Sequence, residues 1–459
     1  MSTPMADALM RVTATANGSL HALPLSGGHS LAGSALRGKY TALLGEEYLA
    51  AEVSYSGVAL DSFFRPRGCI AEAQRLAAAA FGADATQFVT CGTTLANAIG
   101  LDALIRLSGS RSTRALVDRS SHQSVHFALD RPDVDTVYCA QRHDPRREQS
   151  WADIDDLVAR FASAAALDAA FDVVVLSSAG YDGSRIDVHS LLTELFRYTD
   201  TLTVLVDEAW SAVHYFHPDL RVRTALAAAG RVRAEHPGKR LRMLVTHSAH
   251  KSMSSLRQGS YLHVLGDEAL REATRAALYR LHTTSPSLPV LASLDLARAQ
   301  GESEGAALVE RSLGHARTLR DLVRTDPRLE PFDVLDPAWA DARWMCSDPT
   351  KLLLGVDPSV ISPEDLQVRL MRDHGLYIAR AVRAGLLLHL HIGVTAEVFE
   401  RFVAALRTIA VALAPTPPQF GDSLPRFVIA YPPGIPVSVP GEWHDDAACP
   451  RVGVELFRV

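Results

Sequence analysis

Short apolar runs that end in polar, reactive residues recur through the first part of the chain. Five of them end in GTT (92–94), DRSSH (118–122), SSAGYDG (177–183), DEAW (207–210) and THSAHK (246–251). Uninterrupted Val and Leu runs of this length are typical of strands buried on both faces, and such strands belong to parallel sheets covered by helices. The pattern therefore predicts an α/β fold with a mostly parallel sheet.

Helical patterns separate several of these runs. Residues 70–84 carry Ala and Leu at helical spacing and end close to a glycine, so they predict a helix. Residues 86–105 predict a short strand, a Gly-Thr-Thr turn and a second helix. Since ligands of open parallel sheets bind beyond the carboxyl ends of the strands, we expect the five polar ends to converge on one site.

The remaining sequence predicts a smaller α+β domain. A long amphipathic helix is expected from about residue 291, followed by a strand, a helix, a strand and a helix at 350–357, 363–375, 385–394 and 396–414. The tail contains several prolines, so we expect it to wrap over the surface and to form no central strand. The predicted divisions are an arm (1–60), a large cofactor-binding domain (61–300) and a small C-terminal domain with a Pro-rich tail (301–459).

The composition of the chain limits the classes of partner that we expect. The chain has 459 residues, 47% hydrophobic and 21% charged, with a formal net charge of -6, which argues for a soluble protein and against nucleic acid as a partner. Its five cysteines are far apart and predict neither a disulfide framework nor a metal site: Cys69, Cys91, Cys139, Cys346 and Cys449. With no signal peptide or membrane-spanning stretch in the sequence, we expect a cytoplasmic protein whose partners are small molecules.

The polar ends together supply the groups that a pyridoxal phosphate site needs: an amine, an acid for the ring nitrogen, a flat group for the ring face and a cradle for the phosphate. The segments FVTCGTTLANAIG, LVDRSSHQSVHFAL, VDEAWSAVHYFHP, THSAHKSMSSLRQGSYLHV, HTTSPSLPVLASLDLARA and YPPGIPVSVPGE resemble, in the same order, those of the ornithine/lysine/arginine decarboxylases. The resemblance covers about residues 60 to 442. It implies the fold-type-I, aminotransferase-like fold of pyridoxal phosphate enzymes, here without the N-terminal wing domain of larger members.

The resemblance gives three residues catalytic roles. Lys251 would form the Schiff base with the cofactor, Asp207 would face the ring nitrogen, and His122 would lie over the ring. A carboxylate beside the nitrogen keeps it protonated, so that the ring withdraws electrons from the substrate. Considered singly, a lysine is usually a surface charge, an aspartate after a strand is a common turn residue and a histidine is often structural.

Further residues would hold the cofactor. Gly92, Thr93 and Thr94 lie where a strand turns into a helix, so they could bind the phosphate at the positive helix end, although such a motif is often only an N-cap. Ser248 and His250 would complete the cradle from the lysine side.

Two more positions are implied near the cofactor. Trp210 would lie beside it or simply pack in the core. Thr284, within TTS (283–285), resembles a segment that reaches the phosphate of a partner subunit, which predicts a homodimer with shared sites. The same residues could form an ordinary Ser-Pro turn.

The resemblance implies decarboxylation of arginine, lysine or ornithine to the amine and CO2. Where the family usually has Gly-Ile followed by Glu, this chain has Ala379 and Arg380. Arg380 and Arg383 could face solvent or grip a carboxylate, which leaves transamination, elimination or oxidation of a cationic amino acid as an alternative. A non-catalytic binding subunit is a third possibility. Asp182 and Glu442 are candidates for binding the distal cation of the substrate.

Overall fold

The computed structural model describes residues 1–411, apart from 16, 17, 19, 55, 56, 58 and 168, and three strands beyond residue 427. The chain divides into two compact units. Unit 1 comprises residues 1–113 and 200–305, and unit 2 comprises residues 114–199 and 306–459. Among the described helices, none combines the length and the apolar character that a bilayer crossing requires.

Four strands of unit 1 lie side by side in the order β1-β10-β9-β8. They are β1 (Ala85–Val89), β8 (Thr201–Asp207), β9 (Arg240–Ser248) and β10 (Ser260–Leu265). β8 and β9 are parallel, whereas β10 runs antiparallel to both of its neighbours. The interior positions of β9 and β10 are buried on both faces, which explains why their sequences lack polar alternation.

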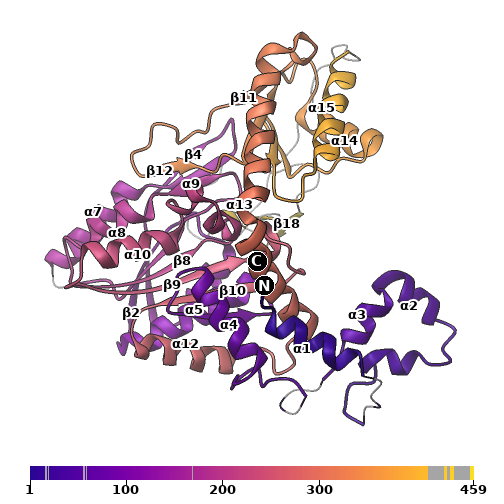
Figure 1. Cartoon of the computed structure of the whole chain (residues 1–459). Coiled ribbons are helices and arrows are strands. Elements are labelled where there is room, and N and C mark those ends of the chain that lie inside the picture. Colours follow the sequence, from indigo (N-terminus) through magenta and orange to yellow (C-terminus); the bar gives the residue numbers. More distant parts are fainter. Residues whose placement is uncertain are drawn as a thin grey trace. The chain divides into compact units, whose positions relative to one another are not determined.

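Helices cover the strands of unit 1. Figure 1 shows α5 (Gly92–Ser108) beside β8, β9 and β10, which it contacts, and α12 (Glu268–Leu281) packs against α5. The other helical elements of this part of unit 1 are α4 (Cys69–Ala80), η2 (Ala212–Phe216), α9 (Pro218–Arg221), α10 (Ala225–Glu235) and α11 (Ala249–Ser252). α4 ends at Ala80, and Gly82 follows two residues later with a φ of +64°, which suits glycine and agrees with the predicted stop.

The N-terminal segment of unit 1 contains α1 (Pro4–Thr13), η1 (Ser26–Leu31), α2 (Arg37–Leu44) and α3 (Glu46–Ala51). α1 packs on α4, and Asp295 accepts hydrogen bonds from the backbone N–H groups of Met5 and Ala6. The start of α1 is thereby attached to unit 1 through a buried carboxylate.

Unit 2 begins with three strands in the order β6-β2-β3. They are β2 (Thr113–Val117), β3 (Val134–Tyr138) and β6 (Val173–Ser177), of which β2 and β6 are parallel. The helices α6 (Gln123–Leu129), α7 (Ile154–Ala166) and α8 (Val188–Leu195) alternate with these strands along the chain. A hairpin of β4 (Gln141–Asp144) and β5 (Gln149–Ala152) and a pair of β7 (Ser184–Ile186) with β12 (Met345–Ser347) complete this part.

The C-terminal part of unit 2 is an antiparallel sheet with two helices. Its strand order is β11-β13-β15-β14, and the elements are β11 (Phe332–Leu335), β13 (Lys351–Val356), β14 (Arg380–Val382), β15 (Gly385–His389), α14 (Pro363–His374) and α15 (Ala396–Val411). Leu354, Leu388 and Leu406 belong to its buried core. α13 (Leu288–Thr325) runs from one unit into the other, and η3 (Pro327–Leu329) follows it.

The tail corrects one expectation. β16 (Val428–Tyr431) is the central strand of a three-stranded sheet, between β17 (Ile435–Ser438) and β18 (Glu455–Arg458). The prediction that the tail forms no central strand is therefore wrong. β16 contains no proline, and Pro436 lies in the edge strand β17, where a missing N–H group is tolerated.

The α/β fold with a mostly parallel sheet is confirmed, as are the predicted strands β1, β2, β6, β8 and β9 and the long helix α13. The division into an arm, a large domain and a small domain at residues 60 and 300 stays a prediction.

Candidate active site

The first turn of α5 begins at a glycine, and no described side chain caps it. Gly92 begins the helix with a φ of +77°, and within the described part of the chain nothing lies within 4 Å of where its Cβ would be. The N-cap residue Cys91 makes no side-chain capping hydrogen bond to the described residues. The N–H of Gly92 donates to the Gln258 carbonyl over 2.8 Å, so the N–H groups that follow it and the positive end of the helix dipole are the features that favour bound phosphate.

Three hydroxyl groups meet at this helix start. Thr93 Oγ1 lies 2.5 Å from Ser248 Oγ and 3.0 Å from Ser260 Oγ. All three residues are buried, and Ser248 and Ser260 are direct partners in the register of β9 and β10. Thr94 is next in the helix and is exposed. The predicted residues Gly92, Thr93 and Ser248 are therefore close together, and Ser260 joins them.

Asp207 ends β8 as a buried carboxylate, 4% exposed. Asn97 Nδ2 donates to Asp207 Oδ2 over 2.8 Å, and the backbone N–H of Ala209 donates to Oδ1 over 3.1 Å. Asp207 is also the register partner of Thr246, two residues before Ser248 on β9. The acid thus lies on the strand next to the one that leads to the hydroxyl cluster.

Lys251 follows β9 in the short helix α11. Its Nζ lies 4.1 Å from the centroid of the Trp210 ring, a cation–π distance. His250 Nδ1 donates to the carbonyl of Gly259 over 3.1 Å. Burial lowers the pKa of His250, and the nearby charges of Lys251 and Arg257 act in the same direction, whereas the hydrogen bond to Gly259 opposes them.

The other two predicted strand ends belong to unit 2. His122 is the N-cap of α6, where its Nδ1 accepts from the backbone N–H of Ser124 over 3.2 Å. The Asp118 carboxylate accepts from the backbone N–H of Ser177 over 3.2 Å, which joins the end of β2 to the end of β6. The hydroxyls of Ser121 and Ser178 are buried, and neither has a hydrogen-bond partner among the described residues.

Arg380 has a carboxylate partner in its own unit. Its Nη2 lies 2.9 Å from Glu148 Oε2, and Arg383 Nε lies 3.6 Å from the other oxygen of Glu148. Tyr181 donates to the carbonyl of Ala379 over 2.8 Å. Arg380 is therefore not solvent-facing, which was the simpler of the two expectations for it.

Asp182 and Glu442 are the two predicted partners for the cation of the substrate. Asp182 accepts hydrogen bonds from both the backbone and the hydroxyl of Ser184, within one tight turn, and burial raises its pKa. Glu442 lies outside the described residues. Thr283, Thr284 and Ser285 form an exposed loop after α12.

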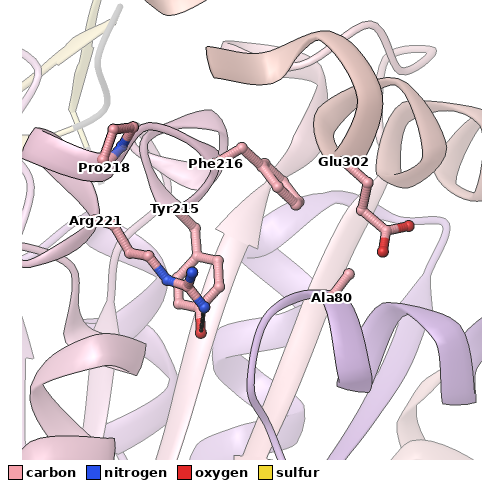
Figure 2. Close-up of a pocket in the computed structure, with 6 residues that line it drawn as sticks. All are labelled: Ala80, Tyr215, Phe216, Pro218, Arg221 and Glu302. Atoms are coloured by element: carbon pink, nitrogen blue, oxygen red, sulfur yellow. Dashed lines mark hydrogen bonds between the residues drawn. The ribbon is translucent and has the colours of Figure 1, made fainter.

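A separate pocket of about 340 Å³ opens elsewhere on unit 1. Figure 2 shows its lining, with the Arg221 guanidinium against the Tyr215 ring and Glu302 of α13 on the other side. The guanidinium carbon lies 4.3 Å from the centroid of that ring, and Nη2 donates to the Tyr215 hydroxyl over 2.9 Å. None of the predicted cofactor residues lines this pocket.

A family model described as Orn/Lys/Arg decarboxylase, major domain, matches residues 3–357. The chain belongs to the Orn/Lys/Arg decarboxylase family. Arginine decarboxylase of Bacillus cereus is 27% identical over 418 residues, which cover 83% of this chain and 85% of that protein. Lysine decarboxylase LdcA of Pseudomonas aeruginosa is 30% identical over 332 residues, 69% of this chain but 42% of that protein.

Solved structures agree with this membership. The Francisella novicida lysine decarboxylase LdcF has a TM-score of 0.75 at 22% identity, over 88% of this chain and 59% of that structure, so this chain spans less than two thirds of it. Oryza sativa TDC with PLP shares the fold at a TM-score of 0.53 and 15% identity. The predicted family, fold type I, amino acid decarboxylase class and pyridoxal phosphate cofactor are thereby confirmed.

The residues of unit 1 fit that cofactor. An open glycine, an uncapped helix start and three hydroxyls suit a phosphate, a buried carboxylate suits a pyridine nitrogen, and a lysine amine stands at the end of the intervening strand. The roles of the individual residues stay predictions.

Sequence reasoning missed Asn97, Thr246 and Ser260. All three are fully buried, but only Asn97 interrupts an apolar run, LANAIG (95–100), and that break was the available signal. Asn97 in particular has no solvent exposure although it lies in the middle of a helix.

Proposed function

We propose that this chain decarboxylates a basic amino acid, arginine, lysine or ornithine, and releases the matching amine and CO2. One observation carries the proposal. In this family member, an uncapped helix start, a buried acid and Lys251 all belong to unit 1. The reaction takes up one proton for each CO2 released, because the bond from the α-carbon to the carboxylate is replaced by a bond to hydrogen.

Bound pyridoxal phosphate supplies the electron sink for the electron pair left at the α-carbon when CO2 departs. The hydroxyls of Thr93, Ser248 and Ser260 would turn from one another toward the phosphate oxygens, and the N–H groups of the first turn of α5 would add to them. Asp207 would accept a hydrogen bond from the ring nitrogen and so keep that nitrogen protonated.

Lys251 would hold the cofactor through Nζ and later return a proton from that atom to the α-carbon. The Trp210 ring lies 4.1 Å from Nζ and would limit the directions that the Lys251 side chain can take. The low pKa of His250 favours a neutral imidazole beside Lys251, which avoids a second positive charge next to the amine.

We further propose a homodimer in which Thr284 contributes to the partner's site. Its position in an exposed loop is compatible with that role. Mixing Lys251→Ala protein with Thr284→Glu protein tests it, because one site of each mixed dimer would then contain only native residues. Activity above that of either variant alone is expected, and no gain after subunit exchange would contradict shared sites.

The experiment for the reaction is an incubation with each basic amino acid in the presence of pyridoxal phosphate, followed by mass spectrometry of products and measurement of CO2. One amino acid should give its amine with an equal amount of CO2, and Lys251→Ala protein should give neither. A keto acid product would instead support transamination. That alternative rests on Arg380 and on the lost family Glu, and the Arg380 guanidinium is already paired with Glu148, which weakens the first of these two grounds.

A further inference from the structure

The side chain of Asn97, a residue of α5, is hydrogen-bonded to residues of two neighbouring strands, β8 and β9. It lies on α5 with no solvent exposure, and its Nδ2 donates to Asp207 Oδ2 over 2.8 Å. Thr246 Oγ1 donates to Asn97 Oδ1 over 2.8 Å. Thr246 and Asp207 are register partners on β9 and β8, so the Asn97 amide spans this pair of strand positions.

These contacts allow the amide one orientation. If the amide were turned over, its oxygen would face the Asp207 carboxylate, and two acceptors would meet without a proton between them. In the observed orientation Asn97 Nδ2 and the N–H of Ala209 each donate to a different oxygen of Asp207. Donors on both oxygens fix the plane of the carboxylate.

The same helix begins with the proposed phosphate site. Asn97 follows Gly92 by five residues, and at 1.5 Å per residue the two lie about 7.5 Å apart along the helix axis. One rigid element therefore carries both the donors for the phosphate and the donor that holds the acid. A displacement of α5 would move both together.

A purely structural role would not require an amide at this position. Between Thr93 and Asp102 the other buried residues of α5 are apolar or glycine, and a leucine at position 97 would bury more apolar surface without desolvating a polar group.

We propose that Asn97 is a positioning residue that holds the Asp207 carboxylate in place for the ring nitrogen of the cofactor. This inference rests on the proposed function, in which Asp207 receives that nitrogen. Asn97 itself would act only through Asp207.

The test measures the dissociation constant of pyridoxal phosphate from full-length protein prepared without the cofactor. In Asn97→Leu the hydrogen bond to the acid is lost, so the dissociation constant should rise about tenfold or more, as expected for a hydrogen bond to a charged group. Asn97→Asp should be worse, because it places a second carboxylate beside Asp207. Thr246→Val removes only the donor that orients the amide and should have the smallest effect.

Two controls separate positioning from general damage. Thr86→Val removes a different buried hydroxyl, which is 2.8 Å from His263 Nδ1, and should lower the melting temperature without changing cofactor affinity. In protein that already carries Asp207→Ala, the Asn97→Leu change should weaken binding little further, because the two residues act as one unit. Additive effects in this cycle would overturn the inference.

The outcomes also distinguish this inference from the proposed function. If Asp207→Ala leaves cofactor affinity unchanged, the role of the acid in the proposed function fails. If Asp207→Ala weakens binding but neither Asn97→Leu nor Thr246→Val does so, the positioning role of Asn97 fails and the proposed function stands.

Discussion

Each unit holds a lysine in a shielded place, and the two differ in what surrounds the amine. Lys351 of unit 2 begins β13 with its side chain 6% exposed, and its Nζ donates to the Gly180 carbonyl over 2.8 Å and lies 3.7 Å from Asp348 Oδ2. Burial lowers its pKa, and the carboxylates of Asp348 and Asp182 oppose that shift. Lys251 of unit 1 is half-buried, and its Nζ faces the ring of Trp210.

A lowered pKa is often used to find catalytic lysines, and Lys351 shows one. Its amine, however, is held by a carbonyl and a carboxylate of its own unit, which is the arrangement of a structural ion cluster. Lys251 instead ends the strand beside the proposed phosphate site. Lys251 follows the carboxyl end of its strand, whereas Lys351 begins its strand. This position therefore distinguishes the two lysines better than burial does.

Substitution of Lys251 should affect activity, whereas substitution of Lys351 should affect stability. Lys251→Ala should lower decarboxylase activity by on the order of 10³-fold or more, because it removes the proposed nucleophile, with little change in melting temperature. Steady-state assays and calorimetry measure the two effects. Residual activity near the native level would reverse our ranking of the two lysines.

Lys351→Met should show the opposite pattern. The substitution leaves Asp348 and Asp182 buried without their cation, so the free energy of unfolding should fall by about 3 kcal/mol. Denaturant titration checks the stability, and the cofactor should still bind. Loss of cofactor binding in folded Lys351→Met protein would argue that unit 2 supplies the nucleophile.

His389, which lies beside Lys351, should make the stability of this region depend on pH. His389 is the register partner of Lys351, and burial, aided by the Lys351 charge, lowers its pKa to about 3, although its Nε2 donates to the Tyr181 carbonyl over 2.8 Å. The unfolded chain therefore binds more protons than the folded one between pH 6.5 and about 3, so stability falls as the pH is lowered through this window.

Between pH 6.5 and about pH 5 this group alone should remove about 2 kcal/mol of stability. His389→Gln protein keeps a donor for the Tyr181 carbonyl and does not titrate, so it should lose less stability than the native protein over the same range. Parallel unfolding curves at both pH values test this, and identical pH slopes would contradict it.

The smallest effect is expected at Trp210. Trp210→Leu removes the ring beside Lys251 Nζ but leaves the amine, so cofactor affinity should fall less than tenfold, in line with about 1 kcal/mol for a cation–π contact. Trp344, which lies in unit 2 and whose indole donates to Asp155, provides a matched control as Trp344→Leu. A large loss of affinity in the Trp210 variant alone would mean that the ring contacts the cofactor itself.

Site residues could be predicted from the sequence where reactive side chains follow the end of a predicted strand. Asp207, Thr93 and Lys251 lie in the polar segments that follow apolar runs, and the resemblance to the decarboxylases gave each of them its role, whereas the fold class followed from the runs themselves. Asn97 and Ser260 could not be named, because their partners are 110 and 167 residues away along the chain. β10 was missed because His263 interrupts its apolar pattern, although that histidine is fully buried between Thr86 and His247.

The most direct test of the central claim is to identify the lysine that carries the cofactor. The chain has four lysines, Lys39, Lys239, Lys251 and Lys351, so borohydride reduction of the cofactor-bound protein followed by peptide mass mapping gives a simple answer. We predict that the cofactor mass is found on the peptide containing Lys251. Its appearance on Lys351 or another lysine, with Lys251 unmodified, would contradict the account.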